Sequence, residues 1–310
     1  MTICIAAICQ QDEKNDEPRI VLCYDWKAEQ VYGGSETSNK MRDLPNGWVA
    51  LMAGTMSRAE ELVAEYETHF RSMKQVADDS ALFSEMKTPA RKQKEKLITE
   101  YIWQTMGVSY SDLVSPCKKF PESIVEQRLN EVAQLKLGAT IILAGFSATD
   151  QGEELRKRMP YLFVVDGESS PEDVVRVEEN FTAIGTGSYV AIPAMHQREH
   201  DEERSLMETI YAVDEAKRLS QVVPGVGETT SITVMYPDGT LKKWSNALFH
   251  RLDSLYERLG PTLDIKKKDA KEFFEFKDEY LIPIDAEEEE EKPKTTRTKR
   301  SASQSPEQAQ

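Results

Sequence analysis

Two apolar runs near the beginning of the chain predict a β-hairpin. Residues 2–9 and 20–25 are both strongly apolar, and the stretch between them is polar and rich in turn-forming residues. Two such runs joined by a polar connection are typical of antiparallel strands. In a hairpin the beginning of the first strand lies opposite the end of the second. The pattern therefore places Thr2 close to Asp25.

A second hairpin is predicted shortly afterwards. Residues 40–44 and 48–52 form two strand-like runs on either side of Asn46-Gly47. The Asn-Gly dipeptide favours the tight turns that join antiparallel strands. The register of this hairpin puts Lys40 opposite the strand end that leads into Gly54. A lysine and a glycine-bearing strand end are thus expected at one rim of the fold.

Helical spacing replaces the strand pattern after the second hairpin. Ser57 and Glu60 have the spacing of a capping box, and apolar side chains then recur at positions 62, 66, 70 and 73. This pattern predicts a helix that begins near Ser57.

An extended helical region is predicted from about residue 81 to residue 137. It contains two helical stretches, 94–106 and 122–137, on either side of a loop. We expect the apolar faces of these helices to belong to the core, and a subunit contact is the alternative. The apolar positions that define these faces are Leu97, Tyr101, Ile124 and Leu129.

The second half of the chain repeats the alternation of strands and helices. A helical stretch is predicted around 205–220. Leucines along one side of 246–259 predict an amphipathic helix that Gly260-Pro261 ends. We take residues 1–260 as one domain, 261–286 as a C-terminal extension with a short docking segment, and 287–310 as a disordered charged tail.

Composition excludes several classes of function. The net charge is -15, which argues against a nucleic-acid partner because phosphate binding needs a concentrated basic surface. The sequence has neither a long apolar run nor a basic leader, so we expect a cytoplasmic protein without a membrane partner. No Cys-x-x-Cys pair is present, and charged neighbours surround His196 and His200. We therefore expect no metal and no cofactor.

Thr2 is the candidate nucleophile. A threonine hydroxyl needs a base beside it, and at a free N-terminus the residue's own α-amino group supplies one. Removal of Met1 would expose that amine, whose ordinary pKa of about 7.7 to 8.0 suits proton transfer near neutrality. Asp25 and Lys40 would supply charge beside the hydroxyl, and the Gly54 N–H could meet a developing oxyanion.

The sequence resembles the N-terminal-nucleophile hydrolases of the proteasome β-subunit type. The matching segments occur in family order and span roughly residues 2–245. They are Thr2 with Ile5-Ala6, Asp25 with Lys27, Lys40-Met41, Met52-Ala53-Gly54, Ala144-Gly145, 160–167, 183–188 and 232–239.

The resemblance implies both a fold and a site. The fold would be of the α+β class, a four-layer αββα sandwich of two antiparallel sheets between helices. The catalytic residues would be Thr2, Asp25, Lys40, Gly54 and Thr186, the last near the amine of the nucleophile. A pocket for large apolar or uncharged side chains would be lined by Ala28, Ser38, Met52 and Met56, with the two methionines as core residues in the alternative.

One segment departs from the family pattern. Where the family has Asp-x-x-Ser-Gly-Gly, this chain has residues 223–228, with Val223 and Val226 in place of the aspartate and serine. Glu228 and Thr229 could replace them only after a local shift. The departure concerns turnover more than the fold.

These features together predict a threonine-type endopeptidase in a self-compartmentalised, proteasome-like particle. Its partners would be further copies of itself in a ring, peptide or polypeptide substrates and an ATP-dependent unfoldase. Two alternatives remain open. The chain could be a catalytically silent ring subunit, or an amidase of the same superfamily that acts on small non-peptide amides.

Overall fold

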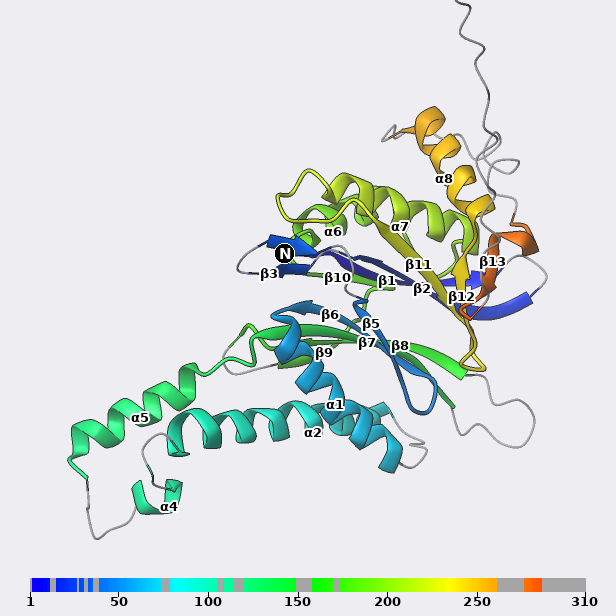
Figure 1. The fold of residues 1–310 in the computed structure, drawn as a ribbon. Helices are drawn as coiled ribbons and strands as arrows, with labels where there is room; N and C mark the ends of the chain where they lie inside the picture. The colour runs from blue at the N-terminus through cyan, green and yellow to red at the C-terminus, as the bar shows by residue number, and fades with distance from the viewer. Residues whose placement is uncertain are drawn as a thin grey trace, which may run out of the picture.

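The computed structural model describes residues 2–11, 15–26, 28–30, 33–35, 39–73, 79–104, 107, 109–113, 120–148, 158–169, 173–260 and 276–285. These residues form two antiparallel sheets flanked by helices, so the predicted α+β class is confirmed (Figure 1). No helix in this part of the chain has the length and apolar character that crossing a bilayer requires.

The first sheet has six strands in the order β10-β1-β2-β11-β12-β13. Their bounds are β1 Cys4–Gln11, β2 Asn15–Asp25, β10 Phe181–Ile184, β11 Thr230–Met235, β12 Leu241–Trp244 and β13 Leu281–Pro283. The predicted first hairpin is present, with Cys4 opposite Tyr24 and Ile8 opposite Ile20.

The second sheet has five strands in the order β5-β6-β7-β8-β9. Their bounds are β5 Met41–Leu44, β6 Trp48–Gly54, β7 Ala139–Ala148, β8 Arg158–Asp166 and β9 Asp173–Arg176. The Asn-Gly turn is confirmed, since Asn46 and Gly47 both have positive φ and Leu44 pairs with Trp48. A separate two-stranded hairpin joins β3 Ala28–Gln30 to β4 Gly33–Ser35.

Both faces of β1 are buried, which explains why its sequence is an unbroken apolar run. Ile3, Ile5 and Ala7 belong to a core cluster shared with the helices on one side. Cys4 and Ala6 belong to a second cluster, which lies between the two sheets. A strand with two buried faces has no need of alternating polar residues.

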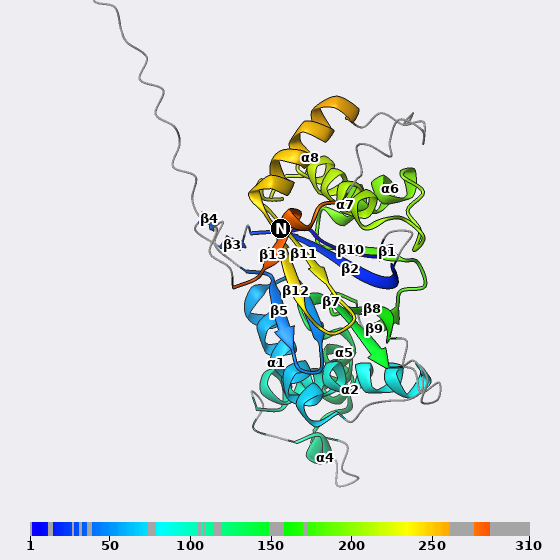
Figure 2. The same cartoon turned by 90° about the vertical axis from the view of Figure 1, so that its right-hand side faces the viewer.

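Helices cover the outer faces of both sheets. α6 Ser188–Gln197, α7 Leu206–Ser220 and α8 Asn246–Leu259 lie over the first sheet. α1 Met56–Ser72 and α2 Asp79–Ile98 lie over the second sheet. Figure 1 and Figure 2 show these two groups of helices on opposite sides of the paired sheets.

Helix boundaries differ from the prediction in the first half of the chain. α1 begins at Met56, with Thr55 as N-cap and no side-chain capping bond, so the capping box predicted at Ser57 is wrong. α2 begins well before residue 94, with Pro89 inside it, and continues into a π-helical turn, η1 Thr99–Trp103.

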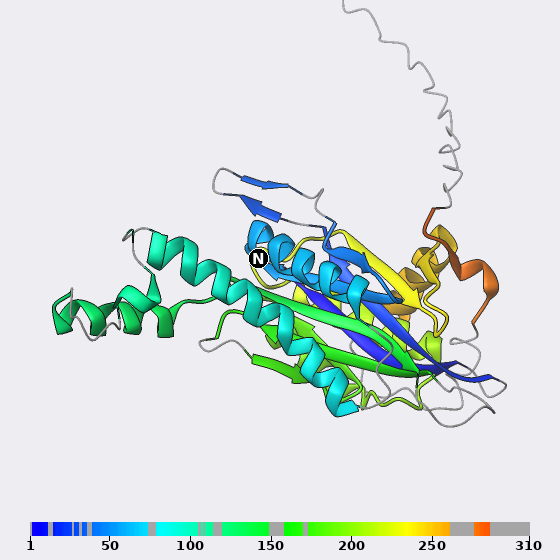
Figure 3. The same ribbon diagram turned by 90° about the horizontal axis from the view of Figure 1, so that it is seen from below.

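Helices form most of the described part of the extended region, but the core role expected for their apolar faces holds only in part. Leu97 is buried, whereas Tyr101 is 53% and Leu129 is 40% exposed. α5 Glu122–Gln134 contains no buried residue, and Figure 3 shows α5 reaching beyond the edge of the sheets. The short α4 Tyr110–Leu113 also lies away from the sheets (Figure 1). In the described part of the chain the apolar face of α5 is therefore covered only in part.

The predicted boundaries in the second half of the chain agree well with the structure. α7 begins with a capping box between Ser205 and Glu208, and α8 runs from Asn246 to Leu259 before Gly260. The docking segment expected within 261–286 contains a short 3-10 helix, Asp278–Tyr280, and then β13, which pairs with β12. The described part of the extension thus completes the edge of the first sheet.

Candidate active site

Asp25 is the centre of a buried hydrogen-bonded group at one end of the first sheet. It ends β2 and is fully buried. Its Oδ1 accepts hydrogen bonds from Thr2 Oγ1 at 2.5 Å, Lys40 Nζ at 2.6 Å and Ile3 N at 3.1 Å. Its Oδ2 accepts one from Gly227 N at 2.7 Å. Four donors from three separate parts of the sequence therefore hold this carboxylate.

Lys40 joins the candidate nucleophile to this carboxylate. Its Nζ donates to Thr2 Oγ1 as well as to Asp25, and only 2% of its side chain is exposed. The backbone fixes its place, because Lys40 O accepts a hydrogen bond from Met52 N at 2.9 Å. The rim predicted from the second hairpin is therefore present, and an ion pair removed from water lies against the threonine hydroxyl.

A tight turn after β10 encloses the backbone of Thr2. Thr2 N donates to Thr186 Oγ1 at 3.2 Å, and Gly187 N donates to Thr2 O at 3.1 Å. Gly185 has a φ of +88°, and a Cβ there would lie 2.4 Å from Thr2 O. Only glycine fits at such a close approach with positive φ. The turn places the Thr186 hydroxyl at the nitrogen that would become the free amine.

Gly54 ends β6 two residues beyond Met52. Its φ is +92°, and a Cβ would lie 3.0 Å from Ala139 Cα, so this position also requires glycine. Strand β6 faces the beginning of β1 across the two sheets, as the bond from Cys4 Sγ to Met52 O shows. Gly54 thus lies on the predicted rim, and its role as an oxyanion donor stays a prediction.

The four residues predicted to line a specificity pocket have different positions. Met52 is fully buried and Met56 is half-buried, and both belong to the helix-side core of the second sheet. This fits the alternative in which they are core residues. Only the backbone of Ala28 is described, in β3, and Ser38 lies outside the described residues.

Sequence reasoning missed the contribution of the loop after α7. Val223 and Val226 are buried in the core beneath the helices. The loop serves the site through its backbone instead, since Gly227 N bonds to Asp25. Lys217 of α7 holds this segment by donating to two of its carbonyl groups. A backbone N–H donor is common to nearly all residue types, so no sequence pattern could predict this contact.

Cys4 lies beside the group but does not compete with Thr2 as a nucleophile. Burial raises the pKa of its thiol to about 12, and the nearby Lys40 offsets only part of that effect. Because the thiolate is the reactive form, this thiol is inert near neutral pH.

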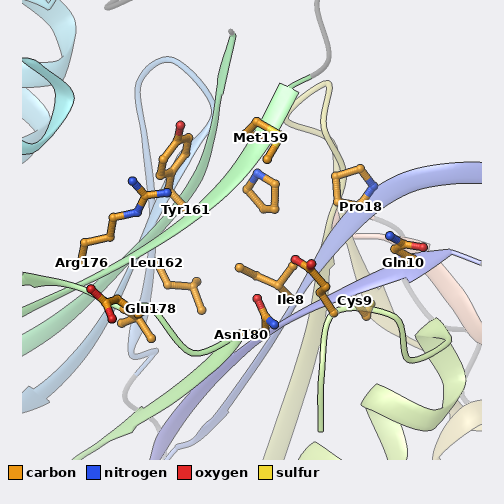
Figure 4. A pocket seen from close by; sticks show the side chains of 13 residues that line it. Ile8, Cys9, Gln10, Pro18, Met159, Tyr161, Leu162, Arg176, Glu178 and Asn180 are labelled. Carbon is orange, nitrogen blue, oxygen red and sulfur yellow. The ribbon is translucent and has the colours of Figure 1, made fainter. Parts of the chain in front are cut away.

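A cavity of about 530 Å³ lies at the other end of β1 (Figure 4). Ile8, Cys9 and Gln10 line it, together with Tyr161 and other residues of the second sheet. At about 3.3 Å per residue of strand, it is roughly 20 Å from Thr2. It therefore takes no part in the group around Asp25.

No known family model matches the sequence, and none of the curated proteins compared with it is similar enough to count as a match.

Proposed function

We propose that this chain is a threonine-type N-terminal-nucleophile hydrolase that cleaves peptide bonds. One observation carries the proposal: the Thr2 hydroxyl lies within hydrogen-bonding distance of both members of a buried Lys40–Asp25 ion pair. Burying an ion pair costs several kcal/mol per ion in desolvation, and clusters of this kind concentrate at functional sites. We also propose that its two sheets and their helices form the four-layer αββα sandwich of this hydrolase class.

The proposed reaction begins with removal of Met1. The freed Thr2 amine, held by Thr186 Oγ1, takes the hydroxyl proton while Oγ1 attacks the carbonyl carbon of a peptide. Lys40 stabilises the negative charge that develops on Oγ1, and Asp25 fixes Lys40. The oxyanion on the attacked carbonyl accepts a hydrogen bond from Gly54 N–H.

Collapse of the tetrahedral intermediate breaks the C–N bond. The leaving amine receives the proton held by the Thr2 ammonium, and an ester joins the acyl group to Oγ1. A water molecule then gives a proton to the Thr2 amine and attacks the carbonyl carbon of the ester. Collapse of this second intermediate breaks the ester C–O bond, passes the proton from the Thr2 ammonium to Oγ1, releases the acid and restores the hydroxyl.

Intact mass and mutation of Thr2 test this proposal. The purified protein should lack Met1, and Thr2→Ala should lower kcat/KM for fluorogenic peptides by several powers of ten while unfolding as the wild type does. Thr2→Ser is the matched control, because it keeps a hydroxyl behind an equally removable methionine. Retained Met1, or hydrolysis undiminished in Thr2→Ala, would refute the mechanism.

The silent-subunit alternative is favoured by Val223 and Val226, which the core buries and which offer no hydroxyl or carboxylate to the site. A peptide vinyl sulfone distinguishes the two proposals. An active site should add the mass of this reagent to the peptide that begins at Thr2. An intact fold without any labelling would favour the silent subunit.

Assembly is the second part of the proposal. An open hydrolase of this kind would be indiscriminate, and enclosing its sites in a ring of identical subunits solves that problem. Closed rings follow from one repeated heterologous interface. Light scattering should report a large homo-oligomer both for the full-length protein and for a chain ending at Ala286. A monomeric full-length protein would refute the ring, and an unfoldase partner is meaningful only if the ring exists.

A further inference from the structure

Lys217 is a buried cation with an unusual set of partners. It lies on α7, its side chain is fully buried, and its Nζ donates to Gly227 O at 2.7 Å and Glu228 O at 2.9 Å. Burial lowers the pKa of this lysine, and charged groups nearby, Asp25 among them, offset only part of the shift. A methionine here would fill the same space without that desolvation cost. The cation therefore calls for an explanation beyond packing.

The segment that Lys217 holds is the one that contacts Asp25. Both polar groups of Gly227 are engaged: its N–H donates to Asp25 Oδ2 at 2.7 Å, and its C=O accepts from Lys217. The start of the loop is anchored separately, by burial of Val223 and Val226 in the core. Lys217 thus fixes the peptide group that restrains the second oxygen of the carboxylate.

We propose that Lys217 is a positioning residue that directs the Gly227 N–H toward Asp25. In this way it holds the side chains of Thr2, Asp25 and Lys40 in their relative positions. It supplies through the backbone the restraint that the side chains at 223 and 226 do not give. Asp25 Oδ1 is shared among three donors, whereas its Oδ2 bond to Gly227 N is the contact that sets the plane of the carboxylate. The catalytic consequence rests on the proposed function, whereas the structural link can be tested without it.

Hydrogen exchange at the Gly227 amide tests the structural link directly. In the wild-type protein this amide should be protected to the same degree as amides within β2, because its acceptor is buried. Lys217→Met should speed its exchange by about tenfold or more, since a buried hydrogen-bond anchor is lost. Exchange in Lys217→Met that remains at the wild-type rate would overturn the proposal.

Arg218→Met is the matched control. Arg218 is the next residue on α7 and forms ion pairs with Asp214 and Asp253, away from the loop. Its loss removes a cation from the same helix without touching Gly227. The control should leave the exchange of the Gly227 amide relative to β2 unchanged. An equal acceleration in both variants would mean that α7 merely loosens, and would also overturn the proposal.

Kinetics supply the second readout. For fluorogenic peptides, Lys217→Met should lower kcat by about tenfold or more and leave KM within about threefold, because the reacting group and not substrate binding is disturbed. Unchanged kcat together with faster exchange would show that the arrangement of the Thr2, Asp25 and Lys40 side chains does not depend on Lys217. If the wild type hydrolyses no peptide, the proposed function fails and the exchange measurement alone decides.

Lys217→Gln replaces Lys217→Met if the latter does not fold. The glutamine amide keeps a donor on a shorter side chain, so exchange at Gly227 should rise less than in Lys217→Met but still exceed that of the control. If neither variant folds, hydrogen exchange at the Gly227 amide of the wild-type protein tests the contact with Asp25. Exchange there as fast as in an unstructured peptide would refute the contact on which the proposal stands.

Discussion

Replacing Lys40 by methionine should destabilise the protein strongly. The Lys40 and Asp25 side chains are 2% and 0% exposed, and Nζ lies 2.6 Å from Oδ1. Breaking a buried ion pair by removing one partner costs about 3–5 kcal/mol, because the other charge stays buried without compensation. Asp25 keeps donors from Thr2, Ile3 and Gly227. We therefore expect a loss near the lower end, about 3 kcal/mol in the free energy of unfolding.

Asp25→Asn should cost a similar amount, since it leaves the ammonium of Lys40 buried without its carboxylate. The double variant removes both charges, so its cost should fall short of the sum of the single costs by about 2–3 kcal/mol. Urea denaturation at pH 7, followed by tryptophan fluorescence, measures the free energy of unfolding of the wild type, the two single variants and the double variant.

A surface ion pair provides the comparison. Arg71 and Glu67 of α1 have side chains that are 69% and 42% exposed, so their coupling energy should be below about 0.5 kcal/mol. The destabilisation in the double variant of the buried pair could equal the sum of the two single destabilisations, as it should for the surface pair. That result would refute the argument that one buried charge stabilises the other. In the proposed enzyme the same two variants should also cripple turnover, with strongly non-additive effects.

Two further predictions concern the turn and the histidine near β1. Gly185→Ala should destabilise by about 2–4 kcal/mol, the sum of left-handed backbone strain and a clash with Thr2 O, whereas Gly107→Ala, whose Cβ would meet nothing within 4 Å, should cost only the backbone part. Equal losses of stability in urea would contradict the clash. Burial lowers the pKa of His200, whose Nε2 lies 3.0 Å from Ile8 O. The unfolded chain therefore binds a proton on this ring more readily than the folded protein does. The stability contributed by the neutral ring is consequently lost as the pH falls below 6.5, the ordinary pKa of histidine. His200→Gln should flatten that part of the stability curve, and an unchanged slope would show that other groups cause it.

The sequence predicts the part of the site that side chains build. An unbroken apolar run and an Asn-Gly turn determine the registers of the two hairpins, and those registers bring Thr2, Asp25 and Lys40 together. These signals are local, because each depends on residue types within one hairpin.

The contribution of Gly227 and Lys217 could not be predicted in the same way. Any residue except proline has the N–H that Asp25 accepts, so the identity at position 227 says nothing about the contact. Lys217 lies within an amphipathic helix pattern, where a lysine is usually solvent-exposed. Only the packing of α7 against the first sheet places it inside.

The helices over the second sheet were harder to delimit for a different reason. Pro89 lies within α2, although proline usually ends a helix, and this obscures the first half of α2. In α5 the apolar spacing is real, but Leu129 is 40% exposed. Periodicity reports which face of a helix is apolar. It does not report whether another element covers that face.

The arrangement of donors around Asp25 has a consequence for the order in which the site forms. Thr2 and Asp25 are synthesised before their partners Thr186 and Gly227, which lie 184 and 202 residues further along the chain. Contacts between residues so far apart form late, because a long loop must close first. In a nascent chain the Thr2 hydroxyl consequently lacks the contacts that surround it in the folded site. Thr2 therefore receives its full set of partners only when the sheet is complete.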